Sequence, residues 1–215
     1  MAALAAFAPA SAHASPWPSS GQAISSVGIG EAAGVETIDL DDWRETPSPI
    51  DRLSLVTHTF TRLTPVGVET EISAASKLQI RSGPRWAAAL EAGPTWLDRA
   101  DSPCRGLGGE IRLGVGRSFG PGAAKSGYAA VEVAHSERTG CAELKADMSV
   151  GYRADEKWLF LAQSFARRSV HGNEALKVQI SAVRFGARRA VQVGVRVRTD
   201  GDDREPALVI GLWRR

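Results

Sequence analysis

The last third of the chain alternates between apolar and polar side chains every two residues. In residues 144–152 the even positions carry Leu, Ala, Met, Val and Tyr, whereas the odd positions carry charged or small residues. The same pattern returns in residues 176–182 and 191–198, and an apolar stretch follows at 207–213. Because successive side chains of a β-strand point to opposite faces, the pattern predicts strands with one apolar and one polar face.

The alternation of apolar and polar residues extends back to residue 52 and predicts a barrel built from hairpins. Ten strands are expected between turns rich in Gly, Pro and Asp, and two weaker strands precede them at 22–30 and 35–43. The ten strands are expected at residues 52–63, 66–81, 85–98, 109–120, 127–137, 142–154, 157–168, 174–186, 188–200 and 205–215. We therefore predict an all-β fold, an up-and-down antiparallel transmembrane β-barrel of about 12 strands, an even number as such barrels require.

The spacing of tryptophans favours a membrane barrel over a soluble barrel or sandwich, which is the alternative. Trp86 and Trp96 share one face of an expected strand, with small and aliphatic residues between them. Ten residues span roughly 33 Å along a strand, or roughly 25 Å across the membrane at the usual tilt, the height of a lipid-facing band. Barrels in membranes carry a girdle of outward aromatic residues at each edge of this band. We expect Trp86, Trp96, Trp158 and Trp213 to belong to these girdles.

Two global properties exclude other classes of protein. The sequence has no run of eighteen apolar residues, which argues against a transmembrane helix. Its formal net charge is only +2, so no strong basic field predicts nucleic acid as a partner.

The N-terminal residues predict export. Residues 1–14 are Ala-rich and end in Ala-His-Ala, a cleavage-site pattern, although no basic residue precedes the apolar run. A disordered Ala-rich tail is the alternative. The expected organisation is a signal peptide at 1–14, an exposed leader at 15–21 and a single β-barrel domain at 22–215.

Placing the C-terminus in the periplasm assigns each connection to one side of the membrane. Segments 98–108 and 169–174 then lie outside and are longer than the periplasmic turns, with 120–126 as the exception. Cys104 and Cys141 fall on the same outer rim, one hairpin apart, so a disulfide between them is possible in an oxidising compartment. Two unpaired small residues are the alternative.

In this arrangement the polar face of each strand lines the barrel interior. The expected lumen-facing residues are Glu69, Glu71, Lys77, Arg81, Glu91, Glu110, Arg112, Glu132, Glu143, Lys145, Asp147, Lys177, Gln179, Gln192, Arg196 and Arg198. One interpretation is a pore whose charges tune passage. The other is a network of opposite charges that fills and stiffens the interior, because buried charges persist only when they are paired.

No combination of residues predicts a catalytic, cofactor-binding or metal site. The adjacent His135 and Ser136 could belong to a lipid-modifying barrel enzyme. No partner carboxylate is evident, however, and rim or wall positions explain both residues better. The Gly-rich stretches 106–109 and 114–116 have no helix after them, so they lack the geometry of a dinucleotide loop. Two cysteines are too few for a zinc site.

Three pairs of arginines lie near strand ends, at 167–168, 188–189 and 214–215. We expect them to contact lipid phosphates or lipopolysaccharide, or simply to mark the membrane interface.

Three segments resemble known sequences: 157–165 (KWLFLAQSF), 176–183 (LKVQISAV) and 208–215 (LVIGLWRR). They are similar to a porin-like or transporter-like group of uncharacterised outer-membrane β-barrel proteins from alphaproteobacteria. The resemblance implies export through a signal peptide, and insertion into the outer membrane by machinery that reads the C-terminal strand. Members of that group close with Trp-Arg-Arg-Phe, whereas this sequence stops at Arg215, so we expect less efficient insertion or a substitute role for Trp213.

The expected function is therefore passive, a pore or transporter-like channel for small solutes with no cofactor. A structural or envelope-assembly barrel with a side-chain-filled lumen is the alternative, and a lipid-modifying enzyme is a weaker one. Outer-membrane lipid, lipopolysaccharide and the barrel-assembly machinery are the expected partners, and the sequence does not indicate an oligomeric state.

Overall fold

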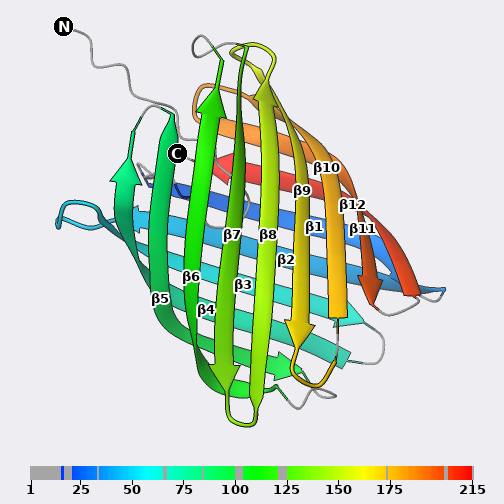
Figure 1. Cartoon of the computed structure of the whole chain (residues 1–215). Coiled ribbons are helices and arrows are strands. Elements are labelled where there is room, and N and C mark those ends of the chain that lie inside the picture. The colour runs from blue at the N-terminus through cyan, green and yellow to red at the C-terminus, as the bar shows by residue number, and fades with distance from the viewer. Residues whose placement is uncertain are drawn as a thin grey trace, which may run out of the picture.

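The computed structural model describes residues 16, 21–32, 34–64, 67–83, 85–99, 104–120, 125–172, 174–200 and 203–214. Within these ranges the chain forms twelve β-strands (Figure 1). They are β1 (Gln22–Ala32), β2 (Val35–Pro47), β3 (Leu53–Thr64), β4 (Gly67–Ser82), β5 (Trp86–Arg99), β6 (Gly106–Phe119), β7 (Ser126–Arg138), β8 (Cys141–Arg153), β9 (Trp158–Ser169), β10 (Glu174–Phe185), β11 (Arg189–Asp200) and β12 (Asp203–Arg214). No helix in these ranges is long and apolar enough to cross a membrane.

The strands close into one antiparallel barrel. Each strand pairs with its neighbours in sequence, and β1 completes the ring by pairing with both β2 and β12. Val27 of β1, for example, lies opposite Leu40 of β2 and Ile210 of β12. The predicted all-β barrel of twelve strands is confirmed. The two weak N-terminal segments are full members of the ring, because each finds pairing partners on both sides.

The two ends of the barrel differ. We call the end where β1 begins and β12 stops the terminus end, where Ala23 pairs with Arg214. We call the other end the loop end. There a two-residue turn joins β7 to β8, and its Gly140 has a φ of 75°, which glycine adopts without strain.

A disulfide ties two strands together at the loop end. Cys104, just before β6, is bonded to Cys141, the first residue of β8, with their Cα atoms 5.0 Å apart. Both cysteines are buried and pack with Leu97 of β5 in a small apolar cluster. The bond therefore ties the connection between β5 and β6 to β8, which lies two strands away from β6 in the ring.

The outer face of the barrel is aliphatic over most of its height. Ile180 and Val195 expose 62% and 61% of their surface, and comparable side chains continue around the ring. Large contiguous apolar surfaces are rare on proteins in water, and a band of this kind is what a lipid-facing barrel presents. The alternation in the sequence thus places apolar groups outside and polar groups inside.

One irregularity reverses the direction of a predicted lumen residue. The register between β4 and β5 shifts between Gln79 and Arg81, which marks a β-bulge. Gln79 pairs with the inward Ala89, whereas Arg81 pairs with Ala88 of the opposite parity and is exposed. The prediction that Arg81 faces the lumen is therefore wrong, because one extra residue turns every later side chain to the other face.

Candidate functional site

An apolar layer crosses the barrel interior near the terminus end. It consists of Ile24, Trp43, Val56, Ala87, Tyr128, Ala130, Leu159, Leu161, Val183, Ala190 and Trp213. Trp213 is only 5% exposed, and its Nε1 donates a hydrogen bond to Oε1 of Gln192 at 2.8 Å. Trp213 therefore faces the interior, and its prediction as a girdle residue is wrong. Its outward neighbours on β12 are Leu212 and Arg214.

The other three predicted girdle tryptophans lie on the outer face. Trp86, Trp96 and Trp158 each expose about two fifths of their surface. Trp86 and Trp158 begin β5 and β9 at the terminus end, whereas Trp96 lies toward the loop end of β5.

Pro16 lies inside the barrel. It is fully buried, and its carbonyl oxygen accepts a hydrogen bond from Nε2 of Gln79 at 2.6 Å. A Cβ placed on Gly114 of β6 would lie 3.5 Å from Cβ of Pro16, so Pro16 lies against the inner face of β6. The expectation of an exposed leader at 15–21 is wrong for Pro16. The predicted signal peptide at 1–14 lies outside the described residues.

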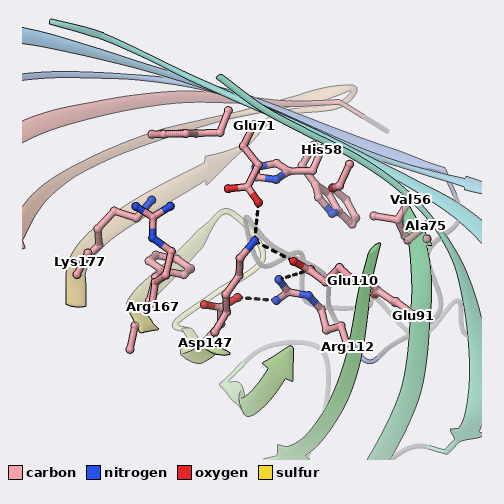
Figure 2. Close-up of a pocket in the computed structure, with 18 of the residues that line it drawn as sticks. Val56, His58, Glu71, Ala75, Glu91, Glu110, Arg112, Asp147, Arg167 and Lys177 are labelled. Atoms are coloured by element: carbon pink, nitrogen blue, oxygen red, sulfur yellow. Dashed lines mark hydrogen bonds and ion pairs between the residues drawn. The ribbon is translucent and has the colours of Figure 1, made fainter. Parts of the chain in front are cut away.

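Arg112 of β6 organises the charged middle of the lumen (Figure 2). Its guanidinium nitrogens lie 2.6 Å from Asp147, 3.1 Å from Glu110 and 3.3 Å from Glu132. The three carboxylates come from β6, β7 and β8, which are consecutive around the ring. One planar cation therefore satisfies three acids, as the fork of N–H donors on arginine allows.

Lys145 and Arg138 extend this network across the interior. Nζ of Lys145 lies 2.5 Å from Glu71 and 2.8 Å from Glu110, which connects β8 to the distant strand β4 (Figure 2). Arg138 lies 2.6 Å from Glu143 and 3.3 Å from the same Glu71. Buried charges are costly unless they are paired and hydrogen-bonded, and these ion pairs supply the required partners.

A second group of ion pairs involves strands that the sequence analysis did not assign to the lumen. These pairs are His58 with Asp41, Lys77 with Glu45, Arg196 with Asp39, and Arg62 with Glu205. The acids of β2 alternate with Ile38 and Leu40, so the same two-residue rule would have placed them inside. The sequence pattern predicted only a weak strand at 35–43, and none of its acids is among the predicted lumen residues.

A cavity of about 130 Å³ lies within the lumen beside this network (Figure 2). Its charged lining comes from His58, Glu69, Glu71, Glu91, Glu110, Arg112, Lys145, Asp147, Arg167, Lys177 and Arg198. Pockets for drug-sized ligands occupy about 300–1,000 Å³. The cavity is therefore large enough for several water molecules or a solute of a few atoms.

Two charged groups in the lining differ from the rest. Nζ of Lys177 lies 4.8 Å from the ring centroid of Phe60 and 5.6 Å from that of Phe165, and no described carboxylate is within ion-pair distance. Glu91 is 7% exposed and forms no ion pair with any described residue. The cavity thus offers one cation and one carboxylate that the described side chains do not neutralise directly.

The remaining predicted lumen residues also lie on the inner face. Glu69, Glu143, Gln179, Gln192 and Arg198 are all buried there. Glu69 and Arg198 line the cavity, whereas Glu143, Gln179 and Gln192 lie elsewhere on the inner face. Glu69 of β4 lies 3.5 Å from Arg167 of β9, so this ion pair joins strands that are not neighbours in the ring.

The geometry does not support a Ser–His catalytic pair. His135 is exposed on the outer face of β7, whereas Ser136 is 0% exposed on the inner face. Adjacent residues of a strand point in opposite directions, so their side chains cannot hydrogen-bond to each other. Among the described residues, no group of three or more His, Cys, Asp and Glu side chains could hold a metal ion.

No protein-family model matches this sequence, and no curated protein matches it either. Solved structures share its fold at very low identity. The NanC porin matches with a TM-score of 0.64 and 10% identity, over 89% of this chain and 99% of the porin. The KdgM porin matches with a TM-score of 0.55 and 8% identity, over 89% and 98% of the two chains. The COG4313 outer membrane channel from Pseudomonas putida F1 matches with a TM-score of 0.55 and 9% identity, over 90% and 93%. The chain is therefore similar in fold to outer-membrane channel barrels.

Proposed function

We propose that the chain is an outer-membrane barrel that passes small solutes through a narrow, charged lumen. The observation that carries this proposal is the lumen cavity lined by charges of both signs, inside a closed barrel with an aliphatic outer face. Water and ions enter such a polar interior far more readily than an apolar core.

The solved structures with a similar fold support the same function. Two of them are called porins and one is called an outer membrane channel. One solved structure shows the KdgM porin in complex with disordered oligogalacturonate. In this chain the cavity volume of about 130 Å³ favours smaller solutes than an oligosaccharide. We therefore propose inorganic ions and small polar molecules as the cargo.

The proposed location has support from both sequence and structure. The resemblance of segments 157–165, 176–183 and 208–215 to alphaproteobacterial barrels favours the outer membrane. Export would use residues 1–14 as a signal peptide, and insertion would use the barrel-assembly machinery acting on β12. Membrane fractionation and heat-modifiable gel mobility test this location. A protein recovered with the periplasmic fraction would contradict it.

Single-channel recording in planar bilayers tests the function. We expect stepwise conductance from the purified, folded barrel, with small unit steps because the cavity is narrow. Heat-modifiable mobility of the same sample serves as the control for folding. Folded protein that produces no steps over a range of voltages would contradict the proposal.

A second candidate function is a closed structural barrel, and a specific observation favours it. The apolar layer near the terminus end is buried, with Val183 at 0% and Ala87 at 1% exposure. Pro16 occupies part of the interior as well. If these groups seal the lumen, the barrel would stiffen the envelope without transport, and the bilayer recordings would stay silent.

A further inference from the structure

The outer face of the barrel carries a row of arginines at the terminus end. It consists of Arg44, Arg81, Arg117, Arg184, Arg189 and Arg214, each exposed and within three residues of a strand boundary. We call this set the arginine belt. It is distinct from the lumen, because the side chains alternate with inward residues such as Trp213 and Trp43.

Like charges face each other directly within the belt. Arg189 of β11 pairs across the ladder with Arg214 of β12, and Arg214 in turn lies opposite Ala23 of β1. Ala23 lies opposite Arg44 of β2, so a single rung across four strands carries three arginines. Like charges opposite one another destabilise a sheet unless an anion lies between them.

The described part of the chain does not supply that anion for most of the belt. Arg44 is paired with Asp42 at 2.9 Å. No carboxylate of the described residues forms an ion pair with Arg184, Arg189 or Arg214. These guanidinium groups are therefore available to an external anion.

Two aromatic contacts fix the height of the belt relative to the membrane. The guanidinium of Arg117 lies 5.2 Å from the ring centroid of Trp86, and that of Arg184 lies 5.8 Å from that of Trp158. Each arginine is also the direct cross-strand partner of its tryptophan. Outward tryptophans lie at the level of lipid headgroups, so the belt lies at the level of their phosphates.

The loop end has a different charge pattern. Its described outward charged residues near strand boundaries are Glu31, Glu36, Asp98, Arg105, Glu137, Arg168, Glu174 and Arg204. Acids predominate there, and Arg168 is paired with Glu174 at 3.0 Å. Among the described residues, exposed arginines without a carboxylate partner are thus concentrated at the terminus end, which points to a function of that end.

We propose that the arginine belt binds the phosphate groups of anionic phospholipids in the leaflet that surrounds the terminus end. This inference rests on the proposed membrane location. A guanidinium group donates two parallel N–H bonds to a phosphate, and opposed arginines such as Arg189 and Arg214 can share one anion. Bound headgroups would remove the repulsion along the rung and hold the barrel at a fixed depth.

The test compares folding into vesicles of phosphatidylcholine with folding into vesicles that also contain phosphatidylglycerol. Heat-modifiable mobility measures the folded fraction, and thermal unfolding measures its stability. We expect anionic lipid to raise the unfolding temperature of the wild type, and high salt to reduce that gain. The variant R184Q/R189Q/R214Q should lose the gain, whereas R168Q/R204Q at the loop end should keep it.

A conservative variant separates charge from folding effects. R184K/R189K/R214K keeps the positive charges and should keep most of the gain from anionic lipid. Native mass spectrometry of detergent-folded protein gives a second measurement, in which the wild type should retain several-fold more phosphatidylglycerol than R184Q/R189Q/R214Q. Equal stability of the wild type in both lipids, or equal gains for both Gln variants, would overturn the proposal. Failure to fold in either lipid would instead count against the membrane location itself.

Discussion

The side-chain amide of Gln79 donates a hydrogen bond to the carbonyl oxygen of Pro16 inside the barrel. The same Nε2 also contacts the carbonyl oxygens of Arg81 and Ala88, which belong to the bulge between β4 and β5. The bulge and Pro16 are therefore held by one amide group. This relationship makes Pro16 part of the lumen lining.

Removing the residues before Gly21 should widen the lumen, because Pro16 occupies part of it. A protein that starts at Gly21 lacks Pro16, and the space beside Gly114 becomes free for water and ions. We expect a several-fold larger unit conductance than in a protein that starts at Ser15, measured under the same salt conditions. Equal conductance of the two proteins would show that Pro16 does not restrict the path.

Lys145 should be among the residues most important for stability inside the barrel. The substitution Lys145→Met keeps the length of the side chain but leaves Glu71 and Glu110 without the cation that they share. Breaking a buried ion pair typically costs about 3–5 kcal/mol. We expect a loss of this order in the free energy of unfolding, measured by denaturant titration of the detergent-folded barrel.

An exposed ion pair provides the matched control for Lys145. Arg168 and Glu174 lie 3.0 Å apart on the outer face, with most of both side chains accessible. Exposed pairs contribute about 0–1 kcal/mol. Arg168→Met should therefore leave the unfolding midpoint nearly unchanged. A similar small effect of Lys145→Met would indicate that water reaches the network freely.

The period-two pattern was sufficient to predict most of the fold. Strong alternation such as Val191 to Val197 predicted strands whose ends agree with the structure within a few residues. It also placed Glu71, Lys145 and Asp147 on the inner face, because side-chain direction in a strand follows from position alone. The inward direction of Trp213 could have been predicted too, since Leu212 and Arg214 have the outward parity.

Other features could not be predicted from the sequence, because they depend on contacts between distant residues. Arg81 turns outward because β4 and β5 shift register at a bulge, and no local motif marks that position. Pro16 lies in the lumen because Gln79 and Gly114, far along the chain, provide a bond and a space. Which acid pairs with which base is likewise set by the curvature of the closed ring.

Reduction of the disulfide should lower stability without changing the fold. The bond between Cys104 and Cys141 spans 37 residues of sequence. Closing a loop of this length typically stabilises a protein by about 3–4 kcal/mol through the unfolded state. We expect the reduced protein, or the variant C104S/C141S, to unfold at a lower temperature but to keep its folded gel mobility. An unchanged unfolding temperature after complete reduction would contradict this prediction.

Lys177 should influence which ions pass. Its ammonium group lines the cavity between two phenylalanine rings, with no described carboxylate at ion-pair distance, so it adds a positive charge that the lining does not cancel locally. Lys177→Gln should shift the reversal potential in a salt gradient toward greater preference for cations. Lys157→Gln, in the exposed turn before β9, is the control and should leave the reversal potential unchanged. If both variants behave like the wild type while stepwise conductance persists, the ions follow a path that does not include this cavity.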